Sequence, residues 1–401
     1  MNKPRLLIIL NRLSIGGPAT NTLSVAAELS SDFEILLLAG EHLPDEQSAD
    51  FLLDTYKGFR VQKIKTLTRS VYLWKDLLSY FQIKKIIREF KPHIVHTHGA
   101  KPGVLVRVAA WQLKVPVILH TFHGHIFHSY FSGFINKLII RTEQILAKIS
   151  TAVIAINQTL EHELKTIYHI APAEKIKLVK LGIDTNQFED TEEKKRKHFR
   201  NEFKLSDETI AIGIIGRLVP VKNHLLFLEL VQQLLKAHQQ KSLKFFIIGD
   251  GPEKNNLIQH LQNQHISFTQ NGSSYQSSAS VIFTSWRKDM DVVYAGLDIV
   301  ALTSLNEGTP VSIMEAMASG KPVVSTNAGG ISEIIKQNET GFISNSLEEL
   351  VTGTQQFILS ETKRKQTGER AKQFAIQHLS KKFEVQELNH LYQHLLKASN
   401  N

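Results

Sequence analysis

Short runs of apolar residues recur along the chain, and between them apolar residues return every three or four positions. Runs that are apolar at every position are typical of strands buried on both faces, as in a parallel sheet. Their alternation with helical periodicity predicts a doubly wound α/β domain. In the first half we expect strands at Leu6–Leu10, Phe33–Leu38, His93–His96, Val117–His120 and Thr151–Ile156, and helices at Ala19–Leu29, Trp74–Glu89, Gly103–Gln112 and Ile135–Lys148.

The same alternation starts again after residue 200. Glu189–Arg200 is densely charged with a single aromatic residue, which predicts a solvated connector or surface helix after a domain boundary near Gly182–Phe188. Gln262–Ser280 is rich in Gln, Asn and Ser and predicts a long surface loop. We therefore expect two domains, residues 1–185 and 186–380. In the second half we expect strands at Ile210–Ile215, Leu243–Ile248, Val281–Thr284, Ile299–Thr303 and Pro322–Ser325, and helices at Asn223–Leu235, Pro310–Ser319 and Lys381–Lys397.

Cysteine is absent from all 401 residues, which excludes disulfides, zinc–thiolate sites and thiol catalysis and fits a reducing cytoplasm. No apolar stretch is long enough for a signal peptide or a membrane-spanning helix, so a soluble or peripheral protein is expected. Residues 1–185 hold 23 Lys+Arg against 15 Asp+Glu, so the net charge of +9 lies almost wholly there. This half is expected either to meet an anionic membrane, lipid phosphate or nucleic acid, or to be a solvated basic face.

Within that half, Lys57–Lys91 holds ten basic residues against Asp76 and Glu89. Aromatic residues are interleaved with them, namely Tyr72, Trp74, Tyr80 and Phe81. Basic and aromatic residues together suit an interfacial membrane contact. They suit single-stranded nucleic acid as well. The alternative is a basic amphipathic helix packed on its domain, with its long side chains in water.

The segment Leu305–Gly320 carries two carboxylates around a predicted helix start. Pro310 fits the first helical position and Thr309 the N-cap. The free amides of a helix N-terminus suit a phosphate. Glu307 lies just before those amides and Glu315 lies within the helix, so both carboxylates can accept hydrogen bonds from sugar hydroxyls. The alternative is a well-capped helix with incidental acidic residues.

Three other loops follow predicted strands and carry groups that suit phosphates. Arg217 and Lys222 follow one strand, where a guanidinium fork and an ammonium can bind a diphosphate, unless they are only surface charges. Ile247–Pro252 is a turn with two glycines, and Asn11–Pro18 places two glycines before a helix. Neither loop has the Gly-x-Gly-x-x-Gly or Walker pattern, which disfavours a nicotinamide or ATP site of standard type.

Histidines are concentrated in one region, at His93, His96, His98, His120, His123, His125 and His128. A metal site is one interpretation. No carboxylate lies near them in the sequence, however, so we prefer a histidine at the end of the fourth strand that faces a cleft. His123 is the candidate.

Taken together, these motifs resemble glycosyltransferase family 4, retaining enzymes of the GT-B fold. The resemblance covers nearly the whole chain and is carried by Gly216-Arg217…Lys222, by Gly249-Asp250-Gly251-Pro252, and above all by Glu307 and Glu315 within a Glu-Gly-x-Pro…Glu-Ala-Met-Ala-x-Gly-x-Pro-Val-Val pattern. It implies two Rossmann-like domains that face each other across a cleft. It also implies that the C-terminal helix, residues 381–399, packs back on the first domain.

The resemblance also implies roles for single residues. Arg217 and Lys222 would hold the donor diphosphate, Glu315 the nucleotide ribose and Glu307 the donor sugar hydroxyls, while His123 would line the acceptor side. Glu307, His123, Arg217 and Lys222 are thus the expected catalytic residues. The nucleotide base would lie by Ser285–Arg287, although members commonly have Gly where Ser285 stands. The remaining donor-binding residues implied are Gly16, Gly17, Gly249, Asp250, Arg287, Gly308, Thr309, Pro310 and Val311.

The function that the resemblance implies is transfer of a sugar, with retention, from a UDP-sugar to an acceptor hydroxyl. The basic first half favours a lipid-linked glycan precursor as acceptor and a peripheral contact with an anionic membrane, so we expect the protein in the cytoplasm or at the inner membrane face. No cofactor, metal or nucleic acid is expected. The alternatives are a nucleotide-sugar epimerase or a pyridoxal-phosphate phosphorylase-like enzyme on the same fold, and a catalytically silent sugar-nucleotide or membrane-binding protein.

Overall fold

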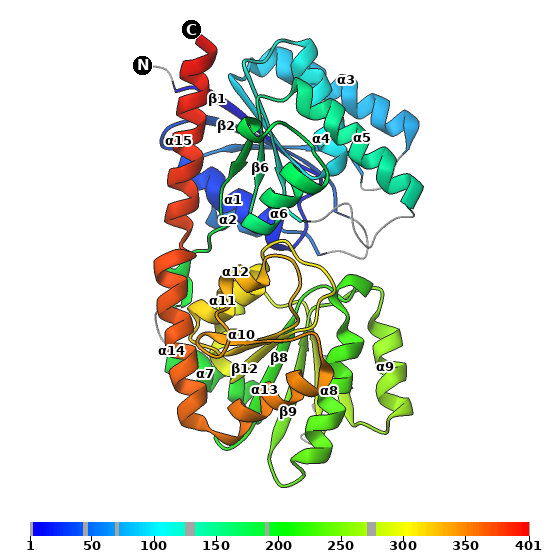
Figure 1. Cartoon of the computed structure of the whole chain (residues 1–401), viewed down its shortest axis with the longest axis vertical. Coiled ribbons are helices and arrows are strands. Elements are labelled where there is room, and N and C mark those ends of the chain that lie inside the picture. The colour runs from blue at the N-terminus through cyan, green and yellow to red at the C-terminus, as the bar shows by residue number, and fades with distance from the viewer. Residues whose placement is uncertain are drawn as a thin grey trace. The chain divides into compact units, whose positions relative to one another are not determined.

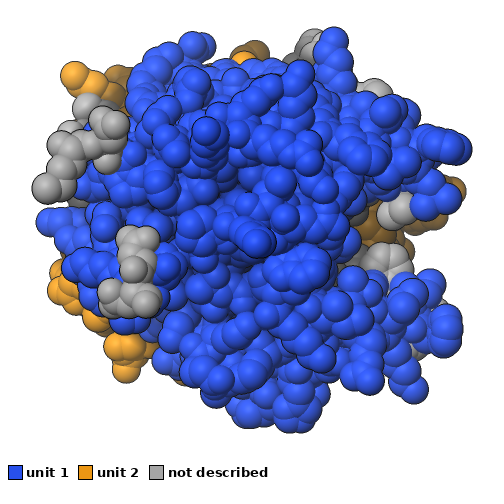
Figure 2. Space-filling model, turned by 90° about the horizontal axis from the view of Figure 1, so that it is seen from above, with its two compact units in different colours: residues 1–182, 381–401 blue, residues 183–380 orange. Residues whose placement is uncertain are grey.

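The computed structural model describes residues 3–42, 47–68, 72–124, 133–188, 192–270 and 278–400. The chain divides into two compact units (Figure 2). Unit 1 comprises Met1–Gly182 and Lys381–Asn401, and unit 2 comprises Ile183–Ser380. The change of unit falls three residues before the boundary expected from the sequence. Each unit contains one seven-stranded parallel sheet covered by helices (Figure 1), so the doubly wound α/β prediction is confirmed.

In unit 1 the strand order is β3-β2-β1-β4-β5-β6-β7. One face of the sheet packs against α1 and α15, and the other packs against α3 and α4. The strands are β1 (Arg5–Leu10), β2 (Glu34–Gly40), β3 (Arg60–Ile64), β4 (Ile94–His98), β5 (Val117–Phe122), β6 (Ala152–Ala155) and β7 (Ile176–Leu178). The helices are α1 (Gly17–Leu29), α2 (Leu52–Thr55), α3 (Leu73–Phe90), α4 (Ala100–Gln112), α5 (Gly133–Ile149), α6 (Gln158–His162) and α15 (Lys381–Asn400), with a π-helical turn at Glu163–Ile167 and a 3-10 turn at Ala173–Lys175.

In unit 2 the strand order is β10-β11-β9-β8-β12-β13-β14. The strands are β8 (Ile210–Ile215), β9 (Leu243–Ile248), β10 (Phe268–Gln270), β11 (Val281–Ser285), β12 (Ile299–Leu302), β13 (Val323–Ser325) and β14 (Gly341–Ile343). The helices are α7 (Glu192–Glu202), α8 (His224–Ala237), α9 (Lys254–Asn263), α10 (Met290–Gly296), α11 (Val311–Ala318), α12 (Ile331–Ile334), α13 (Leu347–Leu359) and α14 (Glu361–His378), with 3-10 turns at Thr185–Phe188 and Pro220–Lys222.

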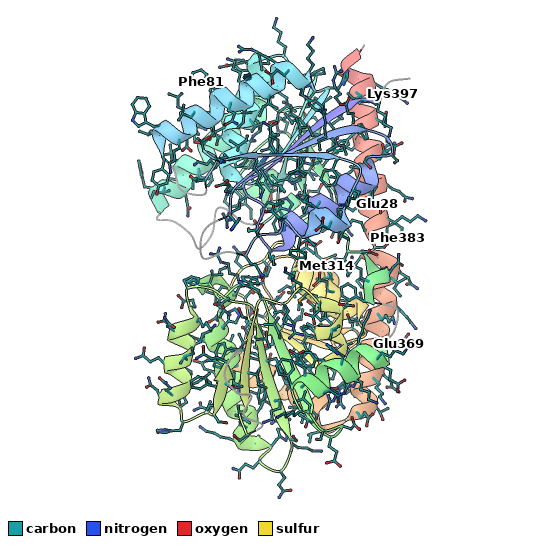
Figure 3. The ribbon with its side chains drawn as sticks, turned by 180° about the vertical axis from the view of Figure 1, so that it is seen from behind. Glu28, Phe81, Met314, Glu369, Phe383 and Lys397 are labelled. Carbon is teal, nitrogen blue, oxygen red and sulfur yellow. The ribbon has the colours of Figure 1, made fainter. Side chains whose placement is uncertain are left out.

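The last helix, α15, is an integral part of unit 1. Leu388, Leu391 and Tyr392 join the core cluster beneath the sheet. At the start of the helix, the Glu384 carboxylate accepts hydrogen bonds from the Asn21 side chain at 2.6 Å and from the Gly182 backbone N–H at 2.9 Å. The helix runs the length of this unit (Figure 3 labels Lys397 near its end). Residues from opposite ends of the chain therefore build one core.

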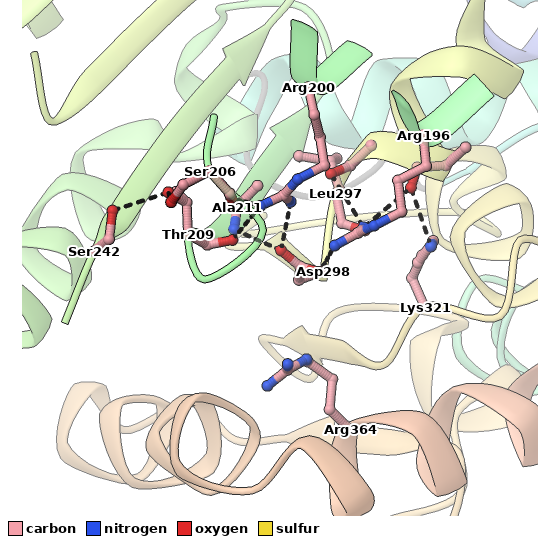
Figure 4. Close-up of polar contacts among 12 residues, drawn as sticks. Arg196, Arg200, Ser206, Thr209, Ala211, Ser242, Leu297, Asp298, Lys321 and Arg364 are labelled. Carbon is pink, nitrogen blue, oxygen red and sulfur yellow. Dashed lines mark hydrogen bonds and ion pairs between the residues drawn. The ribbon is translucent and has the colours of Figure 1, made fainter. Parts of the chain in front are cut away.

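The charged segment Glu189–Arg200 is more than a solvated connector, because the helix α7 that it forms has a buried face. Phe199 is fully buried. Arg196 and Arg200 both bind the carboxylate of Asp298, which precedes β12, and Arg200 also donates to the carbonyl of Thr209 (Figure 4). The sequence hid this face because only one of its anchoring side chains is apolar.

Two further expectations need correction. The segment Gln262–Ser280 is not one long loop, because α9 extends to Asn263 and residues 268–270 form the edge strand β10; residues 271–277 lie outside the described part of the chain. His123 follows the fifth strand rather than the fourth, because Arg60–Ile64 adds a strand, β3, that its mainly polar residues concealed.

Candidate active site

The carboxyl ends of β8 and β12 lie side by side in unit 2, although three strands separate them along the chain. Their register pairs Ile214 with Ala301. The chain leaves β8 toward one edge of the sheet and β12 toward the other. Ligands of doubly wound sheets bind in the crevice at such a reversal of strand order. Arg217 and Lys222 follow β8, and Glu307 follows β12, so the fold brings the predicted groups to one place.

Lys222 and Glu307 form an ion pair at this reversal. Lys222 Nζ donates to Glu307 Oε1 at 2.5 Å, and Ser304 Oγ donates to the same oxygen at 2.5 Å. The Glu307 side chain is 10% exposed and that of Lys222 is 23% exposed. The two loops are also joined through their backbones, since Leu305 N–H donates to the Val221 carbonyl at 2.8 Å. Cation and carboxylate are thus fixed in position while both remain accessible to a ligand.

Two glycines allow the loops around this pair to approach closely. A Cβ on Gly249 would lie 2.0 Å from the carbonyl oxygen of Gly216, beside Arg217. A Cβ on Gly329, which has a φ of +57°, would lie 1.8 Å from the carbonyl oxygen of Glu307. Both contacts are with backbone, which cannot move aside easily. The sequence motif included Gly249, but nothing in the pattern singled out Gly329.

The helix α11 begins one residue later than expected. Pro310 is the N-cap residue, with φ −73° and ψ 109°, and Val311 is the first helical residue, so Thr309 is not the N-cap. Extended backbone at Pro310 delays the first turn. No side chain in the described part of the structure caps this terminus, and its first turn holds no acidic residue. The helix therefore presents uncapped amides beside the Lys222–Glu307 pair, an arrangement that suits an anionic group.

Glu315 lies within α11 and is partly buried. Its Oε2 accepts a hydrogen bond from the hydroxyl of Tyr294, on α10, at 2.9 Å. Burial raises the pKa of Glu315 to about 7, although the Tyr294 hydrogen bond acts in the opposite direction. The sequence did not identify Tyr294, because no local pattern shows that α10 packs beside α11.

We expect Glu315→Gln to stabilise unit 2 in alkaline solution. A carboxyl whose pKa is raised on folding is penalised once it ionises, so the penalty is absent below the unfolded pKa and complete above about 7. The amide removes a penalty of about 3 kcal/mol, because the pKa rises from 4.5 to about 7 at 1.36 kcal/mol per pKa unit. Scanning calorimetry at about pH 8 should show a higher melting temperature for the variant than for the wild type. The difference between the two melting temperatures should decrease toward about pH 5.

The isosteric Gln can still accept the Tyr294 hydrogen bond, so packing is preserved. Tyr294→Phe is the matched control, because it removes the partner and leaves the buried carboxylate without it. This control should lower the midpoint at alkaline pH. A Glu315→Gln variant that melts below the wild type at every pH would contradict the buried-charge interpretation.

At the end of β9, Asp250 joins two loops. It accepts hydrogen bonds from the Ser285 hydroxyl at 2.9 Å and from the Gly251 N–H at 2.8 Å. Burial alone would raise the pKa of Asp250, but these hydrogen bonds and that of Lys254 outweigh burial and leave its pKa lowered. Ser285 has a φ of +57°, a conformation that glycine adopts more easily. Ser285 is also the position where the sequence departs from the family pattern.

Arg287 is bound by two carboxylates. It pairs with Glu202 on α7 and with Asp289, through hydrogen bonds of 2.9 Å and 2.7 Å respectively. The hydrogen bonds of Glu202 raise the pKa of Arg287 further above its ordinary value. The guanidinium thus fixes the loop that follows β11, and its contact with a nucleotide base stays a prediction.

In unit 1 the corresponding reversal of strand order lies between β1 and β4. Gly16 and Gly17 follow β1, and Gly16 is the N-cap of α1 with a φ of +155°. Among the described residues other than its two neighbours in the chain, none has an atom within 4 Å of the position where a Cβ would stand on Gly16. The described residues therefore leave room for an anion at the start of α1, and the diphosphate contact of these glycines stays a prediction.

Histidines follow the next two strands of the same sheet. His123 follows β5, and its Nε2 lies 2.8 Å from Nδ1 of His98 at the end of β4. The His98 ring contacts that of His96, with a centroid separation of 4.2 Å and an angle of 38° between the ring planes. His96 in turn bonds Tyr392 of α15 at 2.6 Å. Burial lowers the pKa of His96 to about 3 and that of His123 to about 4, so both rings are neutral near pH 7.

The structure gives these histidines protein partners. His93 Nδ1 accepts from the Arg5 N–H at 2.9 Å, and His120 Nδ1 lies 2.8 Å from the Thr97 hydroxyl. In the described ranges, no group of three or more His, Cys, Asp or Glu side chains could hold a metal ion. His125 and His128 lie outside those ranges. The structure brings His98 to His123, a pairing that their separation in the sequence did not indicate.

Comparison with known families assigns both halves of the chain. Residues 15–187 match the family described as Glycosyltransferase Family 4, and residues 195–374 match Glycosyl transferases group 1. The two matches include Arg217, Lys222, Glu307 and Glu315 in the second segment and His123 in the first.

Individual relatives agree with this assignment. A UDP-Gal:alpha-D-GlcNAc-diphosphoundecaprenol alpha-1,3-galactosyltransferase of Escherichia coli is 30% identical over 321 residues, which cover 78% of this chain and 76% of the relative. A capsular polysaccharide biosynthesis glycosyltransferase, CapM, of Staphylococcus aureus is 24% identical and covers 83% and 85%.

A solved structure shares the fold across the whole length. Anabaena Alr3699/HepE in complex with UDP and glucose has a TM-score of 0.80 at 20% identity, covering 98% of this chain and all of the other. WaaG, a glycosyltransferase involved in lipopolysaccharide biosynthesis, has a TM-score of 0.72 at 13% identity. The strand-end groups of unit 2, the open glycine loop of unit 1 and these matches lead to one conclusion: the chain is an enzyme of the GT-B fold and belongs to glycosyltransferase family 4.

Proposed function

We propose that the protein transfers a glycosyl unit, with retention, from a UDP-sugar to a hydroxyl of a lipid-linked glycan precursor in cell-surface polysaccharide synthesis at the inner membrane face. The observation that carries the proposal is the Lys222–Glu307 pair at the β8/β12 reversal, beside the uncapped start of α11. One site thereby offers a cation, free amides and a carboxylate, which suit a diphosphate and the hydroxyls of its sugar.

The proposed reaction breaks the bond between the anomeric carbon and the diphosphate oxygen, whose electron pair stays on the diphosphate. Arg217, Lys222 and the amides of α11 stabilise the negative charge that develops there. The acceptor hydroxyl attacks the same face of the oxocarbenium-like sugar, and its proton passes to the departing phosphate oxygen. Glu307 serves the donor sugar hydroxyls rather than acting as nucleophile. The two cationic side chains neutralise the diphosphate, so the proposal includes no metal and no cofactor.

Relatives support the choice of substrates. The Escherichia coli relative is named for UDP-Gal as donor and for a sugar diphosphoundecaprenol, a lipid-linked glycan, as acceptor. Structural neighbours have been solved with UDP and glucose and with UDP-glucose. The neutral His123 is proposed to lie on the acceptor side, held by His98.

A screen of UDP-sugars tests the proposal. The cognate donor should raise the melting temperature of the wild type and be consumed in the presence of an undecaprenyl-diphosphate sugar, and proton NMR of the product should show the anomeric configuration of the donor. An inverted anomeric configuration would refute retention. Conversion of the donor into an isomeric UDP-sugar without acceptor would point to an epimerase instead.

We expect Arg217→Ala to lower turnover by about 10²-fold, because loss of one preformed contact to a developing oxyanion has that typical effect. The measurement is kcat with saturating donor, with Arg364→Ala as control, since Arg364 lies on α14 and binds the Phe357 carbonyl. Near-normal turnover of the Arg217 variant would refute the diphosphate assignment.

A further inference from the structure

Helix α3 exposes apolar side chains on the side that faces away from its own sheet. Its buried stripe consists of Ile83, Ile86, Ile87 and Phe90 with Ser79. At about 3.6 residues per turn, Trp74, Leu77 and Phe81 fall on the opposite side of the helix. Trp74 is 80% exposed. Phe81 lies at the outer edge of unit 1 (Figure 3). A surface helix normally has polar side chains on its outer side, whereas the outer side of α3 is apolar.

Helix α5 repeats the same feature. Glu143 marks its inner side, where it binds Arg107 of α4. On the outer side Phe134 is 80% exposed, and Leu138 and Ile145 follow at helical spacing. Helices α3, α4 and α5 cover one side of the sheet of unit 1 (Figure 1), so both outer sides belong to one surface. We call this surface the apolar outer face; it comprises Leu73, Trp74, Leu77, Leu78, Phe81, Trp111, Phe134, Ile135, Leu138 and Ile145.

Positive charge borders the apolar outer face. The basic residues on α3 and α5 are Lys75, Lys84, Lys85, Arg88, Lys137, Arg141 and Lys148. Of the acidic residues on these helices, Glu143 is buried against Arg107 and Asp76 is bound by Lys101. Only Glu89 remains in solvent, 3.8 Å from Lys85. The surface is therefore apolar in its middle and cationic at its margin.

A pocket of about 740 Å³ with a cationic lining lies beside α5. Arg141 and Lys148 of α5 line it together with Lys165, His169 and Lys175, and no acidic side chain of the described residues lines it. Lys165 is paired with Glu161, and Lys175 donates to backbone carbonyls, so Arg141 and Lys148 supply its uncompensated charge. An anionic headgroup matches this chemistry.

We propose that the apolar outer face of α3 and α5 inserts into an anionic lipid bilayer, with Trp74, Phe81 and Phe134 among the acyl chains and the basic margin at the headgroup phosphates. Aromatic and aliphatic side chains flanked by Lys and Arg are the composition of interfacial helices. A second copy of this chain fits less well, because pairing the same face twice brings the basic margins together. Among the described residues no helix has the length and apolar character to cross a bilayer.

The inference deepens the proposed function, on which it rests, because a lipid-linked acceptor is met only at a membrane surface. Its test uses no substrate, so the two can fail separately. The purified chain is sedimented with vesicles of phosphatidylcholine alone and of phosphatidylcholine mixed with phosphatidylglycerol. The wild type should bind the anionic vesicles and bind the neutral ones far more weakly, and added salt should release it.

Two variants divide the contact into its parts. Trp74→Ser combined with Phe81→Ser should weaken vesicle binding about tenfold or more. Lys85→Gln combined with Arg88→Gln should weaken binding to anionic vesicles about fivefold per lost charge and leave binding to neutral vesicles unchanged. The matched controls are Leu359→Ser and Lys365→Gln, at exposed positions of unit 2, which should bind as the wild type does.

All of these positions are exposed, so melting temperatures and transfer to a water-soluble acceptor should stay as in the wild type. A wild type that binds neither vesicle would overturn the proposal, and so would a Trp74/Phe81 variant that binds normally. If the wild type forms a dimer and binds no vesicles, and the Trp74/Phe81 variant is a monomer, the apolar outer face would be a contact between two copies of the chain. Retained vesicle binding without any glycosyl transfer would refute the proposed function and leave the membrane contact standing.

Discussion

Lys222→Met is expected to lower kcat by about 10²–10³-fold, on the order of 3–4 kcal/mol of transition-state stabilisation. The change removes the ammonium that stabilises negative charge developing on the diphosphate. It also leaves Glu307 with the Ser304 hydroxyl and without its cation. An unpaired carboxylate beside the diphosphate adds repulsion. Steady-state kinetics with the cognate donor measure the effect, and Lys241→Met, at an exposed position beyond α8, is the control.

A second substitution separates the two contributions. If repulsion by the unpaired Glu307 accounts for part of the loss, the double variant Lys222→Met/Glu307→Gln should be less impaired than the product of the two single effects. Lys222→Arg retains the charge and should keep more activity than Lys222→Met. If Lys222→Met has the wild-type kcat at saturating donor, the Lys222–Glu307 ion pair has no role in catalysis.

Glu143→Ala is expected to destabilise unit 1 by about 3–5 kcal/mol, the usual cost of leaving a buried charge unpaired. Arg107 has no exposed side-chain surface, and its Nη2 donates to Glu143 at 2.6 Å. Burial lowers the pKa of Arg107, whereas Glu143 raises it. Without Glu143 the guanidinium keeps its bond to the Gly103 carbonyl and little else. Urea unfolding, followed by a probe in unit 1, measures the loss.

The matched control is the exposed pair Lys85–Glu89, where Glu89→Ala should cost less than about 0.5 kcal/mol. The double variant Arg107→Met/Glu143→Met replaces the ion pair with apolar side chains of similar length. It should recover most of the lost stability, because a well-packed apolar pair rarely costs more than a buried ion pair. A Glu143→Ala variant as stable as the Glu89 control would show that Arg107 finds another partner.

The sequence predicted the central strands of both sheets and missed the edge strands. Every strand expected from an apolar run lies inside a sheet, whereas β3, β7, β10 and β14 were not anticipated and all four are edge strands. An edge strand has one neighbour and often one wet face, so it lacks the continuous apolar run that reveals a central strand. β3 shows the cause, since only Ile64 of its residues is fully buried.

Some residues of the candidate site were likewise predictable from the sequence, and others were not. Arg217, Lys222, Glu307 and Glu315 were predictable because each lies in a short motif next to a strand end or helix start. Two hydrogen-bond partners were not. Tyr294 reaches Glu315 in unit 2, and His98 reaches His123 in unit 1, through packing between segments 21 and 25 residues apart, which no local pattern records. The α11 boundary shifted by one residue because Pro310 adopts extended rather than helical backbone.

The place of α15 in unit 1 has a consequence for synthesis on the ribosome. Leu388, Leu391 and Tyr392 belong to the core that Leu6 and Leu37 begin, so this core stays incomplete until the last helix has emerged. Unit 2 is a continuous segment that ends at Ser380, so its core needs no residue of α15. We therefore expect a chain whose synthesis stops before α15 to have a protease-resistant second unit and a first unit with apolar surface uncovered, because the core of unit 1 needs a helix made more than three hundred residues after its first strand.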